Sequence, residues 1–141
     1  EIASCLVGSE MCIRDRYISI SHTRGYVAVA LHSSCEVGMD IEQYGTRVRK
    51  VASRFIRSDE EPAMMEGDEV YALLLHWSAK EALFKLMGVE EVDFIRHLRI
   101  FPFSLSEEGE FEACEYRTGR QERYRVRYVT HPDFVLTWII K

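Results

Sequence analysis

The chain has 141 residues, of which 47% are hydrophobic and 29% are charged, which suits one globular domain with a single core. Its formal net charge of -5 gives no general attraction to nucleic acid or anionic membranes, so we expect neither as a partner. The four cysteines show no CxxC spacing and the apolar runs are far shorter than a bilayer span, which favours a reducing, cytoplasmic compartment and no membrane segment.

The first sixteen residues show neither helical nor strand periodicity. Within them, residues 10–16 (EMCIRDR) resemble the translation of a transposon adapter used in shotgun DNA sequencing. We therefore interpret residues 1–16 as a non-native segment and residues 17–141 as the domain. An unbroken genomic match through these codons would contradict this interpretation.

Three short strands are predicted next. Tyr17–Ser21 alternates apolar and polar residues, Tyr26–Leu31 is rich in apolar and β-branched residues, and Arg24-Gly25 forms the turn between them. A third strand, Glu36–Glu42, ends in two acidic residues. The pattern therefore predicts a strand pair followed by a strand with an acidic end.

Helical patterns follow the acidic strand. Apolar residues recur at three- and four-residue steps over Val48–Ile56, opposite a basic face, which predicts an amphipathic helix. Ser58–Glu61 resembles the N-terminus of a short second helix. The longest helix is predicted over Asp68–Met87, with Trp77 in its buried stripe and Gly88 as its stop.

The last third of the chain alternates in short apolar and polar steps, which is typical of an antiparallel meander. The four predicted strands are Ile95–Phe103, Phe111–Tyr116, Tyr124–Val129 and Phe134–Ile140. Strands, then helices, then strands in one short chain predict an α+β fold, in which the long helix packs on a mainly antiparallel sheet.

Carboxylates and a short polar turn are the residues that could carry chemistry. Asp40 and Glu42 leave the same face of a strand, at an end that we expect to open onto solvent, and such hard oxygen ligands suit Mg²⁺. Taken alone, the triplet more often just ends a strand in polar residues. Glu81 and Lys85, one helical turn apart, more often form an ordinary surface pair. The Ser21–Thr23 turn offers phosphate donors, yet such turns are common without a ligand.

The combination of these motifs in order is more specific than any one of them. Residues 18–23 (ISISHT), 37–42 (VGMDIE) and 77–85 (WSAKEALFK) together resemble the 4'-phosphopantetheinyl transferase superfamily in its longer, two-half form. The resemblance implies one half of that pseudo-dimeric fold. It also implies a holo-acyl-carrier-protein synthase type of enzyme, which moves the 4'-phosphopantetheine arm of coenzyme A onto a serine of an acyl or peptidyl carrier protein and releases adenosine 3',5'-bisphosphate.

The same resemblance implies a role for each matched residue of the strand and the helix. Asp40, Glu42 and Glu81 would hold Mg²⁺ against the coenzyme pyrophosphate. Lys80 and Lys85 would flank the pyrophosphate. Glu81 would also help to deprotonate the carrier serine, and Lys85 would act beside it in catalysis. These carriers serve fatty-acid, polyketide or peptide synthesis.

The turn and the basic helix receive implied roles too. Ser21 and His22 would contact coenzyme phosphate groups, and the basic face over Arg47–Arg57 would receive an acidic carrier. The N-terminal half of the two-half form, with its Gly-Lys-Pro loop, does not precede Tyr17, so we expect a truncated two-half enzyme. Two other functions remain open: a non-catalytic coenzyme A-binding or carrier-docking module, and a metal-dependent phosphodiesterase.

Overall fold

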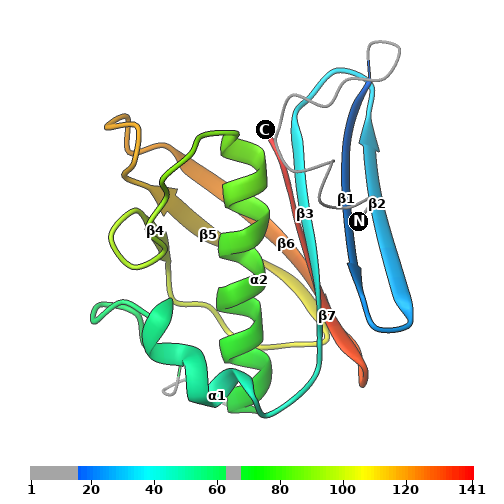
Figure 1. Cartoon of the computed structure of the whole chain (residues 1–141), viewed down its shortest axis with the longest axis vertical. Coiled ribbons are helices and arrows are strands. Elements are labelled where there is room, and N and C mark those ends of the chain that lie inside the picture. The colour runs from blue at the N-terminus through cyan, green and yellow to red at the C-terminus, as the bar shows by residue number, and fades with distance from the viewer. Residues whose placement is uncertain (1–15, 63–67) are drawn as a thin grey trace.

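The computed structural model describes residues 16–62 and 68–141, so nearly all of the predicted non-native segment lies outside the described residues. Strands form one layer, and a long helix covers one side of it (Figure 1), which confirms the predicted α+β class. The elements in chain order are β1 (Tyr17–Thr23), β2 (Tyr26–His32), β3 (Val37–Gln43), α1 (Val48–Val51), the 3-10 helix η2 (Ala52–Arg54), α2 (Glu69–Met87), β4 (Leu98–Ile100), β5 (Glu108–Glu115), β6 (Arg123–Thr130) and β7 (Phe134–Ile140).

The main sheet has five strands in the order β3-β7-β6-β5-β4, and every neighbouring pair is antiparallel. The predicted meander is therefore confirmed, although its first strand is only three residues long. The strand β3 joins the sheet from the other end of the chain by pairing with β7, which sets Asp40 opposite Thr137. No local pattern in the sequence predicts this long-range pairing.

The hairpin of β1 and β2 forms a separate two-stranded sheet beside β3 (Figure 1). Two serines of β1 bridge to the edge of β3. The backbone N–H of Met39 donates to the hydroxyl of Ser19 at 3.0 Å, and that of Ile41 donates to the hydroxyl of Ser21 at 3.1 Å. These bonds satisfy backbone donors on the edge of β3 and bring Ser21 next to Asp40.

The helix α2 begins and ends where the sequence predicts. Asp68 caps its N-terminus by accepting from the backbone N–H of Val70 at 2.8 Å, and Gly88 ends it in the left-handed conformation at φ 60°. Its buried side chains, with the inner face of the sheet, form the core. No helix among the described residues is long and apolar enough to cross a bilayer.

The predicted helix over Val48–Ile56 is shorter than expected, because α1 passes into η2 and the helix stops before Phe55. Residues 58 and 59 form a turn, residues 60 and 61 have no regular structure, and Pro62 is in 3-10 conformation, so no α-helix begins at Ser58. The Glu60 carboxylate turns back into the protein, where it accepts from the backbone N–H of Arg57 at 2.8 Å. The rest of that predicted helix falls on residues 63–67, outside the described residues.

A glycine sets the distance between β3 and α2. A Cβ atom on Gly38 would clash with the carbonyl oxygen of Ala82 and would lie 2.9 Å from the Cβ of Leu86. Only a residue without a side chain allows this approach. The close contact holds Asp40, two residues further along β3, against α2.

The substitution Gly38→Ala tests this contact. We expect it to lower the free energy of unfolding by about 1–3 kcal/mol, because the added methyl group overpacks a backbone contact that cannot relax easily. Urea unfolding would measure the loss. Gly45→Ala is the matched control, since a Cβ atom there meets nothing within 4 Å and the change should be nearly neutral. Equal effects of the two substitutions would contradict the prediction.

Candidate active site

Asp40 lies in the middle of β3 and is only 4% exposed, so the prediction of an acidic strand end open to solvent is wrong for this residue. Its Oδ1 accepts from the hydroxyl of Ser21 and from the ammonium of Lys85, both at 3.3 Å. Its Oδ2 has no hydrogen-bond partner among the described residues. Burial raises the pKa of Asp40, while Lys85 opposes the shift. A buried oxygen with unused acceptor capacity is a place for a ligand to bind.

Glu42 lies two residues further along β3 and is held by an aromatic side chain. The indole Nε1 of Trp77 donates to Oε1 of Glu42 at 3.0 Å. Trp77 is therefore not the purely core residue that its spacing predicts. It is half-buried, and its indole N–H forms a hydrogen bond with the Glu42 carboxylate. Burial raises the pKa of Glu42 to about 8, and the nearby charge of Asp40 adds to the shift.

Glu81 approaches the acids of β3 from α2. Burial raises its pKa to about 7, Asp40 contributes to the rise, and Lys85 opposes it. Trp77, Glu81 and Lys85 are spaced four residues apart, which places them on one face of the helix. The structure therefore brings Asp40, Glu42, Glu81 and Lys85 into one neighbourhood.

These carboxyl groups do not form a ready-made metal cage. Over residues 16–62 and 68–141, no three His, Cys, Asp or Glu side chains are gathered closely enough to hold a metal ion together. Their chemistry nevertheless suits a cation. Burial and mutual repulsion keep the pKa values of Glu42 and Glu81 high, and a positive charge among them would relieve both effects.

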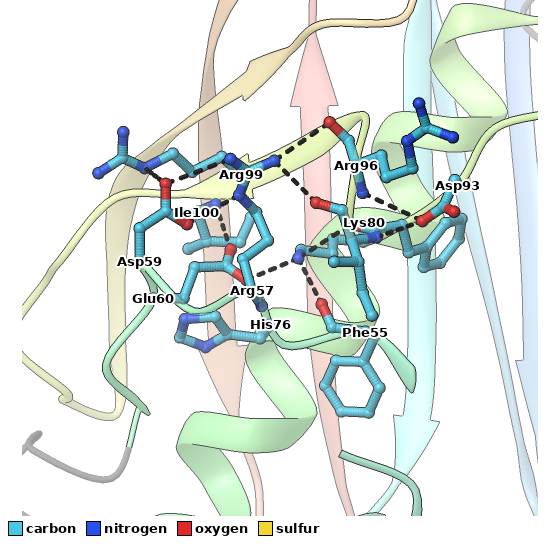
Figure 2. Close-up of polar contacts among 12 residues, drawn as sticks. Phe55, Arg57, Asp59, Glu60, His76, Lys80, Asp93, Arg96, Arg99 and Ile100 are labelled. Atoms are coloured by element: carbon cyan, nitrogen blue, oxygen red, sulfur yellow. Dashed lines mark hydrogen bonds and ion pairs between the residues drawn. The ribbon is translucent and has the colours of Figure 1, made fainter. Parts of the chain in front are cut away.

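Lys80, although adjacent to Glu81 in the sequence, points toward Glu60 and the backbone of Phe55 (Figure 2). Its ammonium is fully buried and donates to the carbonyl of Phe55 at 2.5 Å, to Oε1 of Glu60 at 2.7 Å and to the carbonyl of Phe94 at 3.1 Å. All three of its N–H donors are therefore engaged. Neighbouring helical residues leave the axis about 100° apart, so the structure does not support the predicted phosphate contact of Lys80.

The side chains of Ser21 and His22 lie in different environments. Ser21 is buried, and its hydroxyl is engaged with Asp40 and the backbone of Ile41, so it holds the acid in place. His22, the next residue on the strand, is exposed. Successive strand side chains leave opposite faces, so one phosphate group cannot easily meet both.

A cleft of about 530 Å³ adjoins Glu42, a volume typical of small-molecule sites. Apolar side chains make up much of its wall, and arginines and polar groups complete it. The apolar members are Val48, Val51, Phe55, Leu74 and Trp77, and the polar members include Thr23, Glu42, Arg47 and Arg54. The sequence indicates the apolar spacing of residues 48, 51 and 55 but not that they face Trp77 across a cleft.

Comparisons with known proteins bear on this site. A family model described as the 4'-phosphopantetheinyl transferase superfamily matches residues 36–139. That span includes β3, α2 and nearly all of the five-stranded sheet, and therefore Asp40, Glu42 and Glu81. The β1–β2 hairpin lies before it. A search of curated proteins gave no match.

Proposed function

Because the chain belongs to the 4'-phosphopantetheinyl transferase superfamily, we propose that it transfers the 4'-phosphopantetheine arm of coenzyme A to a serine of an acyl or peptidyl carrier protein, as a holo-acyl-carrier-protein synthase type of enzyme. One observation carries the proposal: acids from β3 and α2 and the ammonium of Lys85 gather next to a cleft of ligand size. Such a group suits a metal-bound pyrophosphate.

We propose Asp40, Glu42 and Glu81 as the residues that hold Mg²⁺. When bound, the ion would neutralise charge on the pyrophosphate of coenzyme A. Mg²⁺ usually takes one or two carboxylates and completes its octahedron with water and phosphate oxygens, so a preformed cage of three side chains is not required. The Oδ2 of Asp40, which lacks a partner in the described part of the chain, supports its inclusion.

Glu81 and Lys85 are the proposed catalytic residues. The reaction forms a bond from the serine oxygen to the β-phosphorus of coenzyme A and breaks the bond to adenosine 3',5'-bisphosphate. Glu81 would accept the serine proton, because a pKa of about 7 suits a general base at neutral pH. Lys85, whose ammonium already lies 3.3 Å from Oδ1 of Asp40, would stabilise the negative charge that develops in the transition state.

The cleft would receive the pantetheine arm, whose methyl groups and amides suit mixed apolar and polar walls. Arg47 and Arg54 line the cleft and would face the acidic surface of the carrier. Two other arginines of the predicted basic face already pair with acids of the chain, which leaves them less available for the carrier. Arg49 pairs with Glu69 at 3.4 Å, and the side chain of Arg57 pairs with Asp59 at 2.8 Å.

Transfer of labelled phosphopantetheine from coenzyme A to an apo carrier protein tests the proposal directly. The carrier should gain the mass of the arm only when Mg²⁺ is present, and a chain extended upstream of Tyr17 should be assayed beside this one. If neither chain modifies the carrier, but coenzyme A still binds, the non-catalytic binding module replaces the transferase. If coenzyme A is instead hydrolysed without a carrier, the phosphodiesterase replaces it.

The pH dependence of stability follows from the raised pKa values of the acids. Glu42 and Glu81 rise from 4.5 to about 8 and about 7, so between these values the folded chain holds protons that the unfolded chain has released. Their contribution to stability is complete below 4.5, decreases as the pH rises above that value, and is fully lost above about 7 for Glu81 and about 8 for Glu42. We expect the melting temperature in EDTA to fall between about pH 5 and pH 8 and to level off above that range, and we expect Mg²⁺ to restore it.

The variant Glu42→Gln isolates this contribution, because the amide does not titrate. Its melting temperature should fall less over the same pH range. A variant that shows the same slope as the original protein would mean that Glu42 does not carry a raised pKa.

A further inference from the structure

A buried ion pair contacts the backbone of Phe55, one of the residues that line the cleft. Lys80 and Glu60 have no exposed side-chain surface, and Nζ of Lys80 lies 2.7 Å from Oε1 of Glu60. The second oxygen of Glu60 accepts from the backbone N–H of Ile100 at 2.6 Å, which anchors the pair to β4. Figure 2 shows the ammonium of Lys80 between Glu60 and the carbonyl of Phe55. The proposed mechanism uses neither side chain.

The contacts of Lys80 lead to an aromatic cluster. The two backbone carbonyls that its ammonium holds belong to Phe55 and Phe94. The rings of these same residues both pack against Trp77, with centroids 5.2 Å and 5.3 Å from that of the indole. One buried ammonium therefore holds the backbone of two residues that contact Trp77.

Trp77 connects these two phenylalanines to Glu42 in the acidic group. Its ring packs against those of Phe55 and Phe94, while its Nε1 donates to Oε1 of Glu42 at 3.0 Å. A shift of either phenylalanine would let the indole move, and the orientation of the Glu42 carboxylate would change with it. Small displacements of a positioned group cost much of its effect on a reaction.

We infer that Lys80 is a positioning residue: it holds the carbonyls of Phe55 and Phe94, these residues clamp Trp77, and Trp77 orients Glu42. The effect on turnover rests on the proposed function, whereas the clamp on Trp77 does not. A direct phosphate contact is a poor alternative, because the ammonium is buried and its donors are used within the protein.

The first test measures the clamp without any enzymatic assay. Lys80→Met alone leaves the Glu60 carboxylate buried without its partner and endangers folding, so the neutral pair Glu60→Gln/Lys80→Met is used beside it. In a Trp138→Phe background, Trp77 is the remaining tryptophan of the chain. We expect the neutral pair to shift the emission of Trp77 to longer wavelength and to increase its quenching by acrylamide. Lys141→Met, on the surface, should change neither.

The second test asks whether Lys80 acts through Trp77. In the transfer assay, the neutral pair should lower kcat about tenfold or more with little change in KM for coenzyme A. Trp77→Phe removes the hydrogen bond to Glu42 and should cause a similar loss. Because both changes break the same chain of contacts, combining them should add little further loss.

Three results would overturn the inference. They are an unchanged Trp77 emission and quenching in a folded neutral-pair variant, losses of kcat that multiply when the changes are combined, and a rise in KM for coenzyme A at constant kcat, which would indicate a phosphate ligand. If the original chain shows no transfer at all, the proposed function fails on its own, and the fluorescence measurements still decide whether Lys80 fixes Trp77.

Discussion

Replacing Glu81 with glutamine is expected to slow transfer to the carrier by about 10²–10⁴-fold, the range typical of removing a general base. The same substitution should raise the melting temperature of the metal-free protein at pH 8. At that pH the carboxylate of Glu81 is charged in a buried site near Asp40. Its pKa is about 7 in the folded chain, compared with an ordinary value of 4.5, so the charged form is less stable in the folded protein than in the unfolded chain. The neutral amide removes that loss. Activity and stability should therefore change in opposite directions.

The control for this prediction is Glu110→Gln, on the exposed face of the sheet, where the carboxylate lies 3.5 Å from Arg125. Exposed ion pairs contribute little, so neither rate nor melting temperature should change much. Asp40→Asn gives a second comparison, because it also weakens the bonds from Ser21 and Lys85 and should not stabilise as Glu81→Gln does. A Glu81→Gln protein with an unchanged transfer rate would exclude Glu81 as base and as metal ligand.

Local signals explain which elements the sequence predicts correctly. The cap at Asp68 and the left-handed Gly88 define α2 from residues next to it in the chain, and the turn at Gly25 defines the first hairpin. The pairing of β3 with β7 has no local signal, since it joins strands from opposite ends of the domain. Glu60, which the pattern assigns to the first turn of a helix, likewise has a distant partner, Lys80 on α2, which no local signal predicts.

The site shows the same division between local and distant information. The motifs locate Asp40, Glu42 and Glu81, and β3 and α2 bring them into one neighbourhood. Helical spacing also separates the side chains of Lys80 and Glu81, because neighbouring helical residues leave the axis about 100° apart. Family resemblance assigns both lysines to phosphate, and it could not reveal that Lys80 has a buried partner twenty residues earlier. The bond from Trp77 to Glu42 likewise depends on tertiary packing.

The buried acids and the buried ion pair place opposite demands on the fold. The acids near Asp40 destabilise the metal-free protein, whereas the bonds of Glu60 and Lys80 tie α2 to β4 and to the loop that carries Phe55. A charged group that is buried without a partner is unfavourable, but here every strong donor of Lys80 meets an oxygen. The pair thus ties down the loop that carries Phe55, a residue of the cleft wall, whereas a bound cation would stabilise the acids near Asp40.

Glu60→Ala is therefore expected to destabilise the protein by about 3–5 kcal/mol, the usual loss when one partner of a buried ion pair is removed. The ammonium of Lys80 would lose its counter-charge, and the backbone N–H groups of Arg57 and Ile100 would lose their acceptor. Urea unfolding at neutral pH measures the change. The melting temperature should fall with it.

The double variant Glu60→Leu/Lys80→Met distinguishes a stranded charge from a general loss of packing. Replacing both partners with apolar side chains removes the buried charge, so much of the stability lost in Glu60→Ala should return. The two backbone N–H groups stay unpaired, which limits the recovery because each costs about 1–3 kcal/mol. A double variant as unstable as Glu60→Ala would place the loss in those backbone bonds, and a fully stable Glu60→Ala would show that the pair contributes nothing to the fold.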